Sequence, residues 1–118
     1  MIGWKRLDNI RFLLEEVIAN DVQGDYIETG VWRGGASIFA RAAMNAFGET
    51  QRFSYVCDSF IGLPPGAKNL LSSDAGWDKT PYLEVPAEIF VAANFKKYGL
   101  LGPNVIFAFI LHSLLQNW

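Results

Sequence analysis

The chain is organised around Tyr26-Ile27-Glu28-Thr29-Gly30-Val31-Trp32-Arg33-Gly34-Gly35-Ala36-Ser37. An apolar run ends in a carboxylate, three glycines follow within six positions, and an alanine-rich helical pattern comes next. This order predicts a strand, a tight loop and a helix start. Glycines there allow positive φ and close approach of a ligand, while the helix N-terminus offers N–H groups. Because open α/β sheets bind ligands at the carboxyl ends of their strands, where Glu28 would lie, the stretch predicts a nucleoside-cofactor site.

Three cofactor-binding patterns compete for this loop. The dinucleotide pattern G-x-G-x-x-G is absent, because three residues separate Gly30 from Gly34. The P-loop pattern is closer, with Gly30, Gly35 and Ser37 in place, but Ala36 stands where a lysine must contact the phosphates. A strand-terminal acid followed by spaced glycines suits S-adenosylmethionine, whose amino and ribose groups are donors and which brings no phosphate. We therefore expect S-adenosylmethionine.

Apolar periodicity predicts the elements on either side of this stretch. Apolar residues recur at i, i+3, i+4, i+7 and i+8 from Ile10 to Ile18, which is typical of one face of a helix. We expect helices at about Asp8–Asn20, Ala36–Phe47 and Pro86–Tyr98, and strands at Tyr26–Thr29, Phe53–Cys57 and Val105–Phe109. Helices that alternate with strands indicate an α/β fold with a parallel sheet.

Asp58 follows the second expected strand and is the second carboxylate at a strand end. In nucleoside-binding α/β proteins an acid at this point accepts hydrogen bonds from the ribose hydroxyls. The alternative is an N-cap for the element that follows, which aspartate commonly provides. Cys57, one residue earlier, would point to the opposite face of the sheet and lie in the core.

Several separate motifs resemble one enzyme family. They are Lys5-Arg6-Leu7-Asp8-Asn9, Glu28-Thr29-Gly30-Val31-Trp32-Arg33-Gly34-Gly35-Ala36, Asp58-Ser59-Phe60-x-Gly62-Leu63-Pro64 and Ala92-Ala93-Asn94-Phe95-x-x-Tyr98-Gly99-Leu100-Leu101. From Met1 to about Phe107 the chain resembles the first half of a macrocin O-methyltransferase. These enzymes transfer a methyl group from S-adenosylmethionine to a sugar hydroxyl of a natural product with the help of a divalent metal.

The resemblance implies the N-terminal half of a Rossmann-like class I methyltransferase fold. This fold has three layers, with parallel strands one to three and flanking helices, so residues 1–118 would form a single partial S-adenosylmethionine-binding domain. The implied cofactor-binding residues are Glu28, Thr29, Gly30, Gly34, Ser37, Asp58 and Ser59. Ribose binding then becomes the preferred role of Asp58, and Glu28 would orient the amino group of the cofactor directly or through water. The helix at Asp8–Asn20 would pack on the sheet and help to cover the cofactor.

The segment from Phe60 to Pro81 is rich in Gly, Pro, Ser and Asp, which predicts a long loop. Loops of this length tend to be functional lids or mobile segments. The resemblance implies a cover over substrate or cofactor, and disorder is the alternative. Asp74 and Asp78 lie four positions apart, but two carboxylates on a loop without a third ligand are more often solvated than metal-bound.

The sequence departs from the family after the third strand. Family members continue with aspartates that hold a divalent metal, expected to be Mg²⁺, and no such motif follows here, so we expect neither catalytic residues nor metal ligands in this chain. The apolar tail Ala108–Trp118 is atypical, as if reached by a shifted reading frame, and its His112 is expected to be structural. Ile61 replaces a glutamate usual in the family. The family's strand order would leave strand one as an open edge, which favours self-association.

Composition excludes several other classes of protein. With 118 residues, 51% of them hydrophobic, and a formal net charge of −2, the chain is expected to form one soluble domain. Its 10 Lys and Arg are scattered, which argues against a nucleic-acid partner. The longest apolar run, Val105–Leu111, is far shorter than the about 20 residues of a membrane span. One cysteine and the absence of a secretory signal predict a cytoplasmic protein.

Three functions stay open at this point. The first is an O-methyltransferase of the macrocin type, represented by its cofactor-binding half and inactive alone. The second is a non-catalytic module that binds S-adenosylmethionine or a nucleoside, complemented by a partner chain. The third is a gene fragment with no function of its own. The missing metal ligands favour the second and third for this polypeptide, whereas the family resemblance favours the first.

Overall fold

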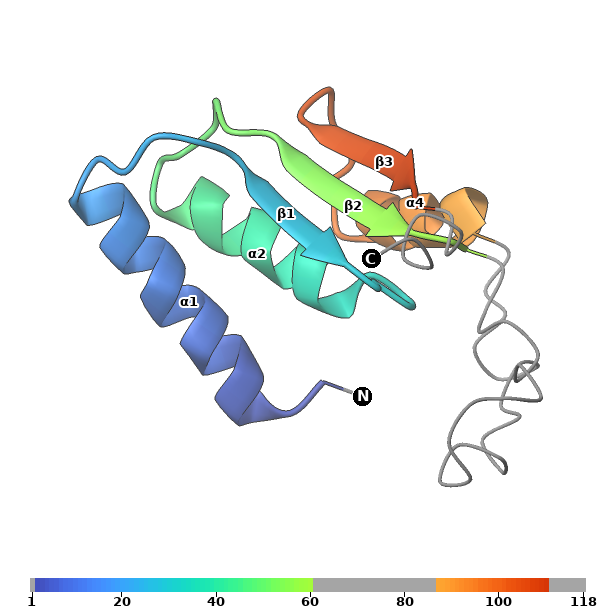
Figure 1. Cartoon of the computed structure of the whole chain (residues 1–118), viewed down its shortest axis with the longest axis horizontal. Coiled ribbons are helices and arrows are strands. Elements are labelled where there is room, and N and C mark those ends of the chain that lie inside the picture. Colours follow the sequence, from blue (N-terminus) through green and yellow to red (C-terminus); the bar gives the residue numbers. More distant parts are fainter. Residues whose placement is uncertain (1, 61–86, 111–118) are drawn as a thin grey trace, which may run out of the picture.

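The computed structural model describes residues 2–60 and 87–110 (Figure 1). The elements in chain order are α1 (Trp4–Ala19), β1 (Tyr26–Thr29), α2 (Gly35–Ala46), β2 (Ser54–Asp58), α4 (Ala87–Lys97) and β3 (Val105–Phe109). The strands form a parallel sheet in the order β1-β2-β3, with β1 at one edge of the described sheet. The predicted alternation of strands and helices, and with it a partial Rossmann-like α/β fold, is confirmed.

The three described helices cover one face of this sheet. Tyr26 of β1 packs with α1 and α2, while Val56 of β2 and Val105 of β3 pack with α4, and the strand register puts these three side chains on the same face. Successive right-handed crossovers that advance in one direction along a parallel sheet place their helices on one side. The described residues therefore form two layers of the predicted three. Ile27, on the opposite face, is 62% exposed.

Predicted and observed element boundaries agree within about one residue except at the start of the first helix. That helix begins at Trp4 rather than at Asp8, with Gly3 as N-cap, and the N–H groups of Arg6 and Leu7 both donate to the Gly3 carbonyl. The prediction was wrong because it relied on the apolar face. The first turn is helical without contributing to that face, and Trp4 is 79% exposed.

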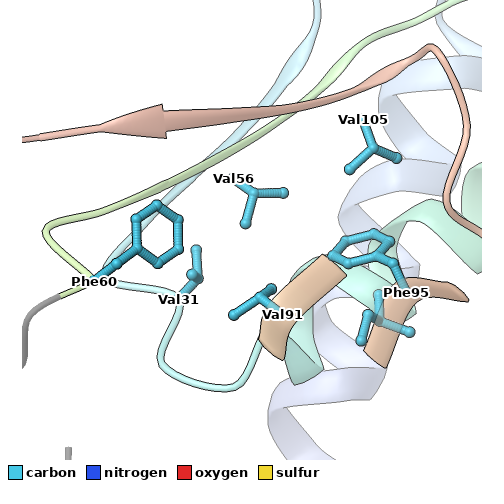
Figure 2. Packing of buried hydrophobic residues seen from close by; sticks show 7 residues of the cluster. Val31, Val56, Phe60, Val91, Phe95 and Val105 are labelled. Carbon is cyan, nitrogen blue, oxygen red and sulfur yellow. The ribbon is translucent and has the colours of Figure 1, made fainter. Parts of the chain in front are cut away.

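A buried apolar cluster joins the β1–α2 loop, the sheet and α4 (Figure 2). Its members are Val31, Ile38, Val56, Phe60, Val91, Phe95 and Val105. Phe95 also meets Phe107 of β3 edge to face, with the ring centroids 6.0 Å apart. Because Val31 of the loop packs in the same cluster as Val91 of α4, the loop after β1 is fixed to both the sheet and this helix.

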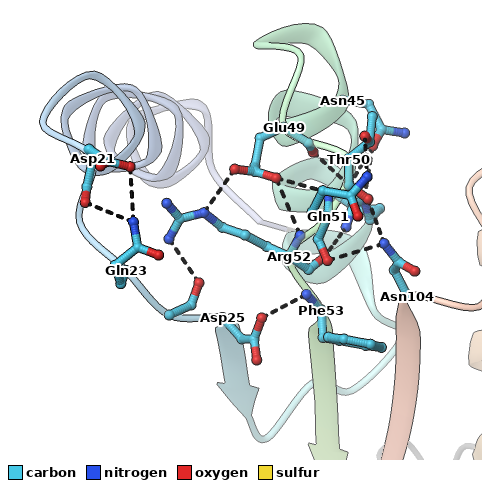
Figure 3. A network of polar contacts seen from close by, with 12 residues as sticks. Asp21, Gln23, Asp25, Asn45, Glu49, Thr50, Gln51, Arg52, Phe53 and Asn104 are labelled. Carbon is cyan, nitrogen blue, oxygen red and sulfur yellow. Dashed lines mark hydrogen bonds and ion pairs between the residues drawn. The ribbon is translucent and has the colours of Figure 1, made fainter.

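A polar network ties together the segments at the amino ends of the strands (Figure 3). The buried guanidinium of Arg41 donates to the carbonyl oxygens of Glu49 and Arg52 and to the side chain of Asn45. Arg52 pairs with Glu49 at 3.1 Å and donates to the Gly24 carbonyl. Burial lowers the pKa of Arg41, although the charge of Glu49 opposes this shift. The network holds the end of the sheet that lies opposite the predicted cofactor site.

Some sequence predictions fall outside the described residues. Of the loop predicted at Phe60–Pro81 only Phe60 is described, so Ile61, Asp74 and Asp78 are not placed, and neither is His112. Of the tail predicted from Ala108, Ala108 and Phe109 belong to β3, and Ile110 donates its N–H to the Asp58 carbonyl. Cys57 is buried, as predicted. In residues 2–60 and 87–110, no helix is long and apolar enough to cross a membrane.

Candidate functional site

Glu28, near the end of β1, is held by a residue of α2. Its side chain points to the helix-covered face, where the fully buried hydroxyl of Ser37 donates a hydrogen bond to Glu28 Oε2. Burial raises the pKa of Glu28, while hydrogen bonds from Ser37 and the positive charge of Arg6 act in the opposite direction. Glu28 is therefore a half-buried carboxylate in a fixed orientation, ready to accept hydrogen bonds from a cationic or hydrogen-bond-donating ligand.

Asp58, the last residue of β2, fastens the loop that follows β1. Its Oδ2 accepts hydrogen bonds from the main-chain N–H groups of Val31 at 2.7 Å and Trp32 at 3.1 Å. Its Oδ1 accepts a hydrogen bond from the N–H of Phe60 at 2.9 Å. Trp32 has a φ of 48°, in the left-handed region that bulky residues rarely adopt. The carboxylate of Asp58 thus stabilises an unfavourable backbone conformation beside Glu28.

The glycines of this loop serve different purposes. Gly30 and Gly34 have φ values of 78° and 79°, so both lie where a side chain is strained. A Cβ atom on Gly34 would also lie 2.6 Å from Cγ1 of Val91, whereas one on Gly30 would meet nothing within 4 Å. Gly34 therefore permits the close approach of the loop to α4, and Gly30 leaves the backbone open on the ligand side.

A cavity of about 500 Å³ lies at the carboxyl end of β1. It is bordered by the first turn of α1, the β1–α2 loop and the last turns of α4. Its lining residues are Ile2, Arg6, Glu28, Gly30, Val31, Trp32, Arg33, Gly35, Ala36, Ile38, Asn94, Lys97 and Tyr98. Its position, at the carboxyl end of a strand and beside the N-terminus of a helix, is where α/β folds bind cofactors.

Some of the predicted site residues line this cavity and others do not. Glu28 and Gly30 line it, and Ser37 lies behind Glu28. The lining residues do not include the other predicted site residues, which are Thr29, Gly34, Ser37, Asp58 and Ser59. Thr29 is exposed on the other face of the sheet, as expected from strand alternation. Glu28 and Asp58 share one face, because Glu28 is paired with Val56, two residues before Asp58.

Several lining residues were not predicted as site residues. Trp32 and Arg33 form one wall, with the Arg33 guanidinium carbon 4.8 Å from the centre of the Trp32 ring, and Asn94 donates to the Arg33 carbonyl. Arg6 comes from α1 and Lys97 from α4. The sequence feature that could have identified these residues is their place in the motifs that resemble the family. Those motifs contain Arg6, Trp32, Arg33 and Asn94. That these residues meet at one cavity depends on how α1 packs on α2 and α4 packs on the sheet.

No metal site is found within the described ranges. Residues 2–60 and 87–110 contain no group of three or more His, Cys, Asp or Glu side chains arranged to hold an ion.

Comparison with known proteins gives consistent matches. Residues 1–113 match the family model Macrocin-O-methyltransferase (TylF). The chain is 46% identical over 110 residues to the 8-demethyl-8-(2,3-dimethoxy-alpha-L-rhamnosyl)-tetracenomycin-C 4'-O-methyltransferase of Streptomyces olivaceus, a match that covers 91% of this chain and 42% of that protein. It is 40% identical over 111 residues to the mycinamicin III 3''-O-methyltransferase of Micromonospora griseorubida, with 91% and 44% covered.

A solved structure also matches. The structure of the O-methyltransferase NovP is similar with a TM-score of 0.78 and 42% sequence identity, over 90% of this chain and 45% of that one. The chain thus spans less than half the length of the relatives that it matches.

Proposed function

Because this chain belongs to the macrocin O-methyltransferase family, we propose that it forms the cofactor-binding part of an S-adenosylmethionine-dependent O-methyltransferase. The relatives are named as O-methyltransferases, and two of the names specify a methylated position on a natural product. The proposed acceptor is accordingly a sugar hydroxyl of a natural product. Since the chain covers 42% and 44% of these two relatives, the complete reaction is proposed for the whole enzyme and cofactor binding for this chain.

The residues at the cavity fit S-adenosylmethionine. A volume of about 500 Å³ is within the usual range of small-molecule sites. The cofactor carries an ammonium group and ribose hydroxyls, which are donors, and Glu28 is an acceptor fixed by Ser37. The cofactor lacks phosphates, and accordingly Ala36 occupies the position at which a P-loop has its lysine.

Each residue has a defined part in the proposed binding mode. S-adenosylmethionine supplies the methyl group when bound. Glu28 accepts a hydrogen bond from the ammonium group, and the buried hydroxyl of Ser37 keeps the carboxylate in place. Gly30 leaves the backbone open beside the ligand.

Asp58 has two parts in this proposal. Its bonds to Val31 and Trp32 shape the loop that borders the cavity. A carboxylate has about four acceptor positions, and the Asp58 carboxylate accepts three short bonds from main-chain N–H groups and one long bond, at 3.5 Å, from the Ser59 hydroxyl. In the proposed binding mode a ribose hydroxyl takes the place of this long bond. Ribose binding by Asp58 therefore remains part of the proposal, with neighbouring Ser59 beside it.

Two further elements of the proposal concern the complete enzyme. Mg²⁺ would assist methyl transfer by binding the acceptor oxygen, and no described residue of this chain is assigned to it. The proposed location is the cytoplasm, which agrees with a buried free cysteine, Cys57.

The single observation that carries the proposal is the Ser37–Glu28 hydrogen bond at the wall of the cavity. The test is isothermal titration of the 118-residue chain with S-adenosylhomocysteine, the demethylated cofactor. We expect one binding site and weaker binding by Glu28→Gln. Glu16→Gln, on the exposed surface of α1, is the matched control and should bind as wild type. No binding to wild-type protein with a folded circular dichroism spectrum would refute the proposal.

A further inference from the structure

Within residues 2–60 and 87–110, the side chain of Arg6 differs from those of Arg11, Arg41 and Arg52 in making no hydrogen bond or ion pair. Arg11 pairs with Asp8 and Glu15, Arg52 pairs with Glu49, and Arg41 is enclosed by four hydrogen bonds. For the guanidinium of Arg6, the described part of the chain offers no hydrogen bond or ion pair. Arg6 nevertheless borders the same cavity as Glu28.

The charges of Arg6 and Glu28 act on each other without direct contact. The positive charge of Arg6 acts to lower the pKa of Glu28, against the larger effect of burial. Among the described residues, however, the two side chains do not approach within ion-pair distance. The two opposite charges therefore border one cavity without forming an ion pair with each other, so both are able to contact a ligand.

The other two cations at the cavity are less suited to this pairing. The guanidinium of Arg33 is stacked over the ring of Trp32. Lys97 is in the last turn of α4, where a cation favours the helix dipole, and it is not among the charges that shift the pKa of Glu28. Arg6 is therefore the lining cation best suited to act together with Glu28.

We propose that Arg6 and Glu28 together bind the α-amino acid end of the cofactor, with Arg6 contacting its carboxylate and Glu28 its ammonium group. This inference rests on the proposed function and extends it to a residue of α1. Opposite charges at one cavity complement a zwitterion, and the planar guanidinium matches a carboxylate with two parallel hydrogen bonds. Arg6 is therefore a specificity-determining residue for cofactors that retain the amino acid group.

The test compares two ligands that differ in this group. S-adenosylhomocysteine has the zwitterion, while 5'-methylthioadenosine has the same nucleoside and thioether without it. By isothermal titration of the full chain, Arg6→Gln should weaken binding of S-adenosylhomocysteine about two- to fivefold, as expected for a solvent-accessible ion pair. Its affinity for 5'-methylthioadenosine should equal that of wild type. Arg11→Gln, on the same helix but away from the cavity, should change neither affinity.

Results other than a selective loss in Arg6→Gln would overturn either the role of Arg6 or the proposed function. Unchanged S-adenosylhomocysteine affinity in Arg6→Gln, or an equal loss for both ligands, overturns the role of Arg6 while the proposed function stands. A selective loss in Lys97→Gln instead of Arg6→Gln also overturns it. If wild-type protein binds neither ligand, the proposed function itself fails. Should Arg6→Gln not fold, Arg6→Lys decides, because it keeps the charge, loses the planar fork and should show a smaller but selective loss.

Discussion

The carboxylate of Asp58 accepts a hydrogen bond from the main-chain N–H of Trp32 at 3.1 Å, and Trp32 has a φ of 48°. The end of β2 therefore sets the backbone conformation of the loop that follows β1. Because that loop borders the cavity, the shape of the site depends on an acid that does not line it.

Asp58→Ala should destabilise the fold and weaken cofactor binding. The substitution leaves the N–H groups of Val31, Trp32 and Phe60 without their acceptor, so we expect a loss of about 2–3 kcal/mol in the free energy of unfolding. Binding of S-adenosylhomocysteine should weaken by about 1–3 kcal/mol. Urea unfolding and isothermal titration measure the two effects.

Asp25→Ala is the matched control for Asp58→Ala. Asp25 Oδ1 also accepts a main-chain hydrogen bond, from Phe53 at 2.9 Å, but at the amino end of the sheet. This variant should lose stability and keep wild-type affinity. Equal affinity losses in both variants would show that Asp58 acts only through general stability.

Gly34→Ala should cost more stability than the same change at Gly48. Both glycines have φ near 80°, so alanine is strained at either position by about 1–2 kcal/mol. Only at Gly34 would the new Cβ also lie 2.6 Å from Val91, which adds about 1–3 kcal/mol of overpacking. Thermal unfolding of the two variants gives the comparison, and equal losses would contradict the packing of the loop against α4.

The stability difference between Glu28→Gln and wild type should depend on pH. Burial raises the pKa of Glu28 in the folded state. The folded chain then holds this proton more tightly than the unfolded chain, so wild type loses stability as pH rises from the unfolded-state pKa through the folded-state pKa. Glutamine does not ionise and still offers Ser37 an acceptor, so the variant should gain relative stability across this window.

Urea unfolding over a pH series measures this effect. Glu16→Gln, at an exposed position of α1, provides the control series. A constant difference between Glu28→Gln and wild type at all pH values would show that Glu28 is not desolvated in the folded chain.

The edge position of β1 predicts self-association. Among the strands that the structure describes, β1 pairs only with β2, so its other edge presents free backbone groups, and the Ile27 side chain beside it is 62% exposed. We expect the weight-average mass in sedimentation velocity to rise with concentration and Ile27→Lys to reduce this rise. Ile89→Lys, which alters an 84% exposed isoleucine on α4, should leave it unchanged. A strictly monomeric wild-type chain would exclude association through this edge.

Much of the fold was predictable because it follows from local sequence patterns. The bounds of β1 and β3 were predicted from apolar runs between turn residues. Glu28 was predicted as a site residue because it lies at the end of a strand. The left-handed conformation of Trp32 was not predictable, since it depends on a hydrogen bond that the Trp32 N–H donates to an aspartate 26 positions later in the chain. The position of Arg6 at the cavity follows from the way α1 packs on α2, which periodicity does not specify.

The central claim is that the cavity at the end of β1 binds S-adenosylmethionine through Glu28. A crystal structure of this chain with S-adenosylhomocysteine tests it most directly. We expect the ligand in the cavity, with its amino nitrogen about 3 Å from a carboxylate oxygen of Glu28 or joined to it by one water. A ligand bound elsewhere, or one whose amino group points away from Glu28, would show that Glu28 does not bind the cofactor.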